Sequence, residues 1–147
     1  MDKNGVIVVI EDDMDDQELL TMVFNHLECP NEIVFFQNGE DTIDYLMRPE
    51  VSPFLILCDI NMPRMNGYEL KKKACSMGTL RQKCVPFLFF STSTSETQAR
   101  DAYDQSVQGF FIKPTNFDEL LATIKAILEY WRRCYSPVRP GSDIQNN

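Results

Sequence analysis

Charged and hydroxyl side chains follow several short apolar runs in this sequence, each directly after a run ends. Glu11 and Asp12 follow residues 6–10, Asp59 follows residues 54–58, Ser91 follows residues 86–90 and Lys113 follows residues 110–112. If the apolar runs are parallel strands of one sheet, the loops that carry these residues meet at the carboxyl edge of that sheet. Three carboxylates, one hydroxyl and one ammonium group would then lie close together.

This set of side chains predicts a site for a cation and a phosphoryl group. Neighbouring carboxylates repel one another and call for a counter-ion. An acidic site made only of oxygens suits Mg²⁺, which takes one or two carboxylates directly and keeps several waters. The lysine adds a positive point charge suited to a phosphoryl oxygen. Asp13, Asp15 and Asp16 are instead interpreted as solvated acids that stabilise the dipole of a first helical turn.

Strand-like and helix-like patterns alternate along the whole chain. The expected strands cover residues 6–10, 33–36, 54–58, 86–90 and 110–112. Helices are expected with Leu20, Val23, Phe24 and Leu27 on one face, over residues 40–47, from Asn66-Gly67 through Ala74, from 93 to about 106, and from 116 to 131. The last two helices begin with capping boxes, Ser93 with Glu96 and Asn116 with Glu119.

The alternation predicts an α/β fold, a five-stranded parallel sheet with five helices on both faces. We expect one domain over residues 4–132 and a loosely ordered tail over 133–147, with no output domain. Ligands of such folds bind outside the carboxyl ends of the strands.

The charge and residue composition of the chain limit the kinds of partner and the cellular location that we expect. The chain has 147 residues and a net charge of −8, which argues against nucleic acid and anionic membranes as partners. No apolar run is long enough for a membrane helix and no signal peptide is evident, so a cytoplasmic protein is expected. The five cysteines include no C-x-x-C pair and are interpreted as reduced. The one histidine, His26, is interpreted as structural.

Longer motifs around these residues resemble those of a known family. The acidic pair Glu11-Asp12 follows the strand Val-Ile-Val-Val-Ile, residues 58–70 read CDINMPRMNGYEL, and residues 109–114 read GFFIKP. Together with Ser91, these motifs resemble the receiver domain of the response regulators of two-component signalling, whose fold is flavodoxin-like. The resemblance covers about residues 4–132 and points to the stand-alone class, in particular to the small regulators paired with phytochrome-type histidine kinases.

The resemblance implies a role for each site residue. Asp59 would accept a phosphoryl group from a phosphohistidine on a sensor histidine kinase. Mg²⁺ would be held by the side chains of Asp12 and Asp59 and the backbone carbonyl of Asn61, with Glu11 acting through water. Hydrolysis of the acyl phosphate would return the protein to rest, without turnover of a separate substrate.

The resemblance also implies a switch. Ser91 and Lys113 would bind phosphoryl oxygens, and inward movement of Ser91 would admit the ring of Phe110. The partner-binding face would comprise the helix after residue 91, the strand 110–112 and the last helix, where Tyr103 and Trp131 lie. This face is also the candidate surface for a homodimer and for an unidentified downstream protein. A cis peptide bond between Lys113 and Pro114 is expected to aim the lysine across the site.

Other interpretations stay open. A phosphate sink without an output partner and a pseudo-receiver scaffold that is never phosphorylated share these motifs. A flavodoxin-like FMN carrier shares the architecture, but acids after its first strand would repel the FMN phosphate. An aspartyl phosphohydrolase needs a second Asp two residues after the first, where this chain has Asn61. No P-loop motif is present.

Overall fold

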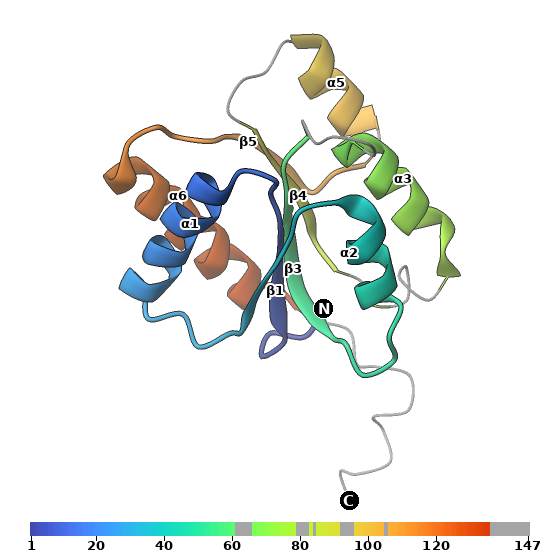
Figure 1. Cartoon of the computed structure of the whole chain (residues 1–147), viewed down its shortest axis with the longest axis horizontal. Coiled ribbons are helices and arrows are strands. Elements are labelled where there is room, and N and C mark those ends of the chain that lie inside the picture. The colour runs from blue at the N-terminus through green and yellow to red at the C-terminus, as the bar shows by residue number, and fades with distance from the viewer. Residues whose placement is uncertain (61–65, 79–82, 84, 92–95, 105, 136–147) are drawn as a thin grey trace, which may run out of the picture.

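Strands and helices alternate from one end of the chain to the other in the computed structural model, which describes residues 1–60, 66–78, 83, 85–91, 96–104 and 106–135 (Figure 1). The elements are β1 (Val6–Ile10), α1 (Met14–His26), β2 (Ile33–Phe36), α2 (Gly39–Leu46), β3 (Pro53–Cys58), α3 (Gly67–Ser76), β4 (Phe87–Ser91), α5 (Glu96–Asp104), β5 (Gly109–Ile112) and α6 (Phe117–Arg133). No helix among these residues is long and apolar enough to cross a bilayer.

The five strands form one parallel sheet in the order β2-β1-β3-β4-β5. In β3 and β4 every residue is buried, because helices cover both faces of the central strands. The register pairs Ile10 with Cys58 and Cys58 with Phe89, so β1, β3 and β4 reach nearly the same level at their carboxyl ends. This confirms the predicted fold class and brings three strand ends to one edge, the upper edge of the sheet in Figure 1.

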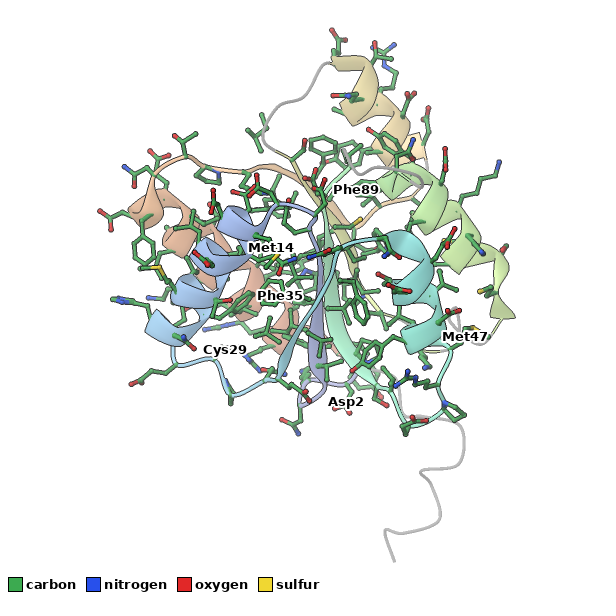
Figure 2. The ribbon with its side chains drawn as sticks, in the orientation of Figure 1. Asp2, Met14, Cys29, Phe35, Met47 and Phe89 are labelled. Carbon is green, nitrogen blue, oxygen red and sulfur yellow. The ribbon has the colours of Figure 1, made fainter. Side chains whose placement is uncertain are left out.

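Each face of the sheet has its own apolar core. Alternate strand residues such as Val9 and Leu57 pack with α1 and α6, whereas Val8 and Phe89 pack with α2, α3 and α5. Figure 2 shows this division at two labelled rings, with Phe35 on the α1 side and Phe89 on the α3 side. Because side chains alternate between the faces of a strand, continuous apolar strands supply both cores at once.

Side-chain caps fix where the helices begin. Asp13 accepts the N–H groups of Asp15 and Asp16 at α1, and Asn116 accepts those of Asp118 and Glu119 at α6. The second cap confirms the predicted start of the last helix. The predicted cap at Ser93 lies outside the described residues.

Gly67 at the start of α3 meets a requirement for close packing. A Cβ atom there would lie 2.9 Å from the carbonyl oxygen of Asp59 and 3.0 Å from Cα of Ile60. The Gly67 N–H group donates to the Ile60 carbonyl at 3.1 Å. The glycine of the Asn66-Gly67 pair therefore lets α3 approach the backbone that carries Asp59.

Arg132 fastens the last turn of α6 to the opposite end of the sheet from the acidic residues. Its guanidinium donates to the side-chain oxygen of Asn31 at 2.5 Å and to the carbonyl of Lys3 at 3.3 Å, and lies over the Phe54 ring. Asn31 is buried and donates in turn to the carbonyls of Lys3 and Gly5. One arginine thus joins α6, β3 and both segments that precede β1 and β2.

We expect Arg132→Ala to lower the free energy of unfolding by about 1–2 kcal/mol, because the buried Asn31 oxygen loses its charged donor. Urea denaturation measures this change. Arg133→Ala is the matched control, because Arg133 is the next residue along the same turn and is exposed. Equal losses in the two variants would show that the contacts of Arg132 contribute nothing specific.

Candidate functional site

Backbone hydrogen bonds hold two acidic residues side by side at the carboxyl edge. The Asp59 N–H group donates to the Ile10 carbonyl at 3.0 Å, and the Glu11 N–H group donates to the Phe36 carbonyl at 2.9 Å. These bonds extend the pairing of β1 with β3 and β2 by one residue beyond the strands. The carboxylates of Glu11, Asp12 and Asp59 consequently offer oxygens that all lie within 4.8 Å of one another.

Lys113 places an ammonium group against these acids. Its Nζ lies 2.6 Å from Oε2 of Glu11 and 3.1 Å from Oδ2 of Asp16, and its side chain is only 4% exposed. The other Glu11 oxygen, Oε1, accepts the N–H of Asp13 at 3.1 Å. In the sheet, β3 and β4 separate β1 from β5, a gap of about 14 Å at a strand spacing of about 4.8 Å. The side chains of Lys113 and Glu11 together therefore bridge the ends of β3 and β4, next to Asp59 and Ser91.

Burial and pairing act in opposite directions on the pKa of each of the two buried partners, Glu11 and Lys113, and both pKa values end up raised. Burial raises the pKa of Glu11 to about 7, outweighing the hydrogen bond and positive charge of Lys113, which lower it. Burial lowers the pKa of Lys113, but hydrogen bonds and charges from Glu11 and Asp16 outweigh it and leave that pKa raised. The lysine thus stays charged at neutral pH, whereas Glu11 gains or loses its proton close to neutral pH.

Ser91 and Phe110, the two residues of the predicted switch, lie on the adjacent strands β4 and β5. Ser91 ends β4 and is fully buried, and its carbonyl accepts the Lys113 N–H at 2.6 Å. Phe110 is half-buried in β5, with its ring 6.4 Å from that of Phe89 in an edge-to-face arrangement. Asn61 lies outside the described residues.

The predicted cis peptide bond between Lys113 and Pro114 is wrong. No peptide bond among the described residues is cis, and both of these residues are described. A trans bond is the favoured form even before proline. The lysine nevertheless reaches Glu11 and Asp16, so the trans backbone suffices to carry its side chain over the site.

Two residues of α1 that the sequence analysis did not assign to the site contribute to it. Asp16, predicted to be a solvated helix-end acid, pairs with Lys113. Gln17 donates from Nε2 to the Glu11 carbonyl at 2.7 Å and so fixes the first turn of α1 against the end of β1. The sequence separation of Asp16 and Gln17 from the pair Glu11-Asp12 does not predict either contact, because both contacts depend on how α1 packs over the sheet edge.

The donor set fits a hard divalent cation. Three carboxylates offer oxygen ligands, one of them exposed, and no sulfur or imidazole ligand joins them among the described residues. Oxygen donors with an open, solvated side suit Mg²⁺, which keeps several waters, better than metals that prefer nitrogen or sulfur. The predicted acidic set is thus assembled at the predicted edge.

The fold and this edge define a class of protein. Residues 7–125 match the family described as the response regulator receiver domain. The chain therefore belongs to the response regulator receiver family, whose members act in two-component systems and interact with histidine kinases and downstream targets.

Individual relatives cover most of the chain. A "Probable methanogenesis regulatory protein FilR2" of Methanothrix harundinacea is 30% identical over 130 residues, which are 86% of this chain and 83% of that protein. The crystal structure of the phosphorylated cyanobacterial phytochrome response regulator RcpA is 28% identical, with a TM-score of 0.80 over 90% of this chain and 97% of that one. The Mn²⁺-bound form of response regulator Rcp1 is 24% identical, with a TM-score of 0.76 over 91% and 99%. Rcp1 comes from a Synechocystis species.

Proposed function

We propose that this protein is a phosphorelay regulator in which Asp59 accepts a phosphoryl group from the phosphohistidine of a sensor histidine kinase. The observation that carries the proposal is the convergence of the Glu11, Asp12 and Asp59 carboxylates within 4.8 Å, with the Lys113 ammonium against Glu11. A carboxylate nucleophile next to a cation site and a fixed ammonium has what phosphoryl transfer requires, namely position and neutralised charge. RcpA, a similar regulator, is phosphorylated in its crystal structure.

Each of the site residues Asp59, Lys113 and Ser91 has a separate role in this mechanism. A carboxylate oxygen of Asp59 attacks phosphorus, and the bond between phosphorus and the donor imidazole breaks as the new P–O bond forms. Lys113 pairs with one phosphoryl oxygen, and the hydroxyl of Ser91 donates to another. Water later hydrolyses the acyl phosphate, so the protein returns to rest and turns over no separate substrate.

A Mg²⁺ ion would be held by Asp12 and Asp59 directly and by Glu11 through water. The backbone carbonyl of Asn61 is a further expected ligand. When bound, the ion supplies positive charge to the phosphoryl oxygens. Asp12 is the exposed member of the set and so remains open to solvent and to a hydrated ion.

The proposed output surface consists of α5, β5 and α6. Tyr103, Ile112 and Tyr130 are large side chains on these elements that are each about 60% exposed, at 60%, 59% and 63%. Phosphorylation would draw Ser91 inward, move the Phe110 ring and so change this surface for a downstream protein or for a second copy of the chain. A cytoplasmic location belongs to the same proposal, because a kinase charges its histidine from ATP.

Incubation with a small acyl phosphate donor tests the proposal. With Mg²⁺, intact-mass measurement should find one phosphoryl group per chain, and with a chelator it should find none. Asp12→Ala should weaken Mg²⁺ binding at least tenfold while the fold persists, because it removes a direct ligand. Uptake that is independent of divalent cations, or unchanged metal affinity in Asp12→Ala, would contradict the proposed site.

The pH dependence of Mg²⁺ binding should report on Glu11. Because the pKa of Glu11 is raised to about 7, the carboxyl is protonated at pH 6 and must lose that proton to assist the ion. The apparent affinity should therefore fall about tenfold from pH 8 to pH 6. Calorimetric titration measures it, and Glu11→Gln should bind more weakly and lose the dependence. His26→Gln is the control and should keep it, because His26 lies in the last turn of α1, away from the site.

A further inference from the structure

Asp16 is the one acid of the first turn of α1 that the structure pairs with the site. Its Oδ2 lies 3.1 Å from Nζ of Lys113, and its side chain is 27% exposed, compared with 4% for the lysine. Asp15, its neighbour in the same turn, is exposed. The two aspartates thus share a charge and a helix end, but only Asp16 contacts Lys113, the lysine that binds phosphate in the proposed function.

The position of Asp16 is fixed from two sides. The Asp13 side chain accepts the Asp16 N–H at 3.3 Å, which sets the helical start, and Gln17 anchors the same turn to the Glu11 carbonyl at 2.7 Å. The carboxylate therefore does not depend on a mobile segment to reach Lys113. It meets the ammonium across 97 residues of sequence, and this contact ties α1 to the residue after β5.

The ammonium has a limited number of donors. Lysine offers three N–H groups, and in the unphosphorylated protein Glu11 and Asp16 accept from the nitrogen at 2.6 and 3.1 Å. A phosphoryl oxygen on Asp59 needs one strong, charge-assisted bond from the same nitrogen. One N–H group remains, so the competition is for the position and charge of the ammonium. Moving toward Asp59 lengthens its contacts with Glu11 and Asp16, and the lost attraction reduces the free energy gained when the phosphoryl group binds it.

We propose that Asp16 is a positioning residue that holds Lys113 toward α1 in the resting protein and competes with the phosphoryl oxygens of Asp59 for its ammonium group. The inference rests on the proposed function, because it assigns regulation to the same site. Phosphorylation then draws the lysine from Asp16 and frees the first turn of α1 from the residue after β5. Asp16 thereby sets how readily the resting protein enters the phosphorylated form.

Fluoroberyllate, a phosphoryl mimic, tests the competition without a kinase. We compare its affinity at saturating Mg²⁺ by fluorine NMR in wild type, Asp16→Asn and Asp15→Asn, which lose the same charge from the same turn. Asp16→Asn should bind about three- to tenfold more tightly than wild type, whereas Asp15→Asn should change by less than twofold. Asp16→Glu, which can still reach the ammonium, should stay near wild type.

A second measurement separates the contact from a general effect of charge. In a double-mutant cycle, the unfolding equilibrium constants of Asp16→Asn and Lys113→Gln should be coupled about threefold, and those of Asp15→Asn and Lys113→Gln uncoupled. A merely structural Asp16 would lower the affinity for the mimic when replaced, the opposite of the expected gain. Equal affinities in wild type and Asp16→Asn, or no coupling, would overturn the role of Asp16. A wild type that takes up no fluoroberyllate would overturn the proposed function, and the competition with it.

Discussion

Asp59→Asn should take up no phosphoryl group from an acyl phosphate donor under conditions in which the wild type takes up one. The amide keeps the size of the side chain but removes the anionic oxygen that forms the bond to phosphorus. Asp59 is buried at the end of β3, within 4.8 Å of two other carboxylates, so one negative charge fewer should not harm the fold. We expect the free energy of unfolding to stay the same or rise, because mutual repulsion at this edge decreases.

Intact-mass spectrometry measures the uptake, and peptide mapping of the wild type locates it. Asp15→Asn serves as the matched control and should be phosphorylated like the wild type. Full uptake by Asp59→Asn would show that another residue is the acceptor. Loss of both uptake and cooperative unfolding would trace the effect to the fold instead of the chemistry.

Lys113→Met should lower the free energy of unfolding by about 3 kcal/mol at pH 8 without divalent cations. Breaking a buried ion pair from one side leaves the other charge without its partner, which is costly. Glu11, with a pKa of about 7 even beside the lysine, would have a still higher pKa without it. A carboxyl whose folded pKa exceeds its unfolded value stabilises the fold at low pH and loses that contribution as the pH rises through the folded pKa. The loss in Lys113→Met should therefore be smaller at pH 5.5 than at pH 8.

Urea denaturation at both pH values measures this difference. The double variant Glu11→Gln with Lys113→Met should recover at least about 1 kcal/mol at pH 8, because no charge is left buried alone. Lys125→Met is a suitable control on the exposed surface of α6 and should change stability by less than about 0.5 kcal/mol. A loss in Lys113→Met that is independent of pH would mean that Glu11 is not the group left uncompensated.

Apolar runs predicted most of the fold because the physical signal is local. Buried parallel strands such as β3 are continuous apolar segments, and the Asn116 cap directly precedes the first residue of α6. The order of elements then implied that Glu11, Asp59 and Lys113 share one edge. That prediction needed no side-chain detail, because parallel strands bring their carboxyl ends together.

The contacts that the sequence missed depend on distances between elements. Asp15 and Asp16 are both aspartates of the first turn of α1, so the sequence does not distinguish them. Only the packing of α1 over the sheet edge brings Asp16 to Lys113. The peptide bond before Pro114 is trans and not cis as the family resemblance implies, and no local sequence pattern distinguishes the two isomers there. Side-chain pairs across the sheet, and not the elements themselves, are therefore what the structure adds.

The two-sided core has a consequence during synthesis. The face of the sheet that packs against α1 also needs α6, since Leu20 and Phe24 share one apolar cluster with Leu120 and Ile124. About 60 residues separate the end of β3 at Cys58 from the start of α6 at Phe117. At about 5–20 residues per second, a ribosome takes roughly 3–12 seconds to make them. During that interval, the face of the sheet that α6 will cover is exposed to water. It stays accessible to chaperones and to neighbouring chains until α6 has been made.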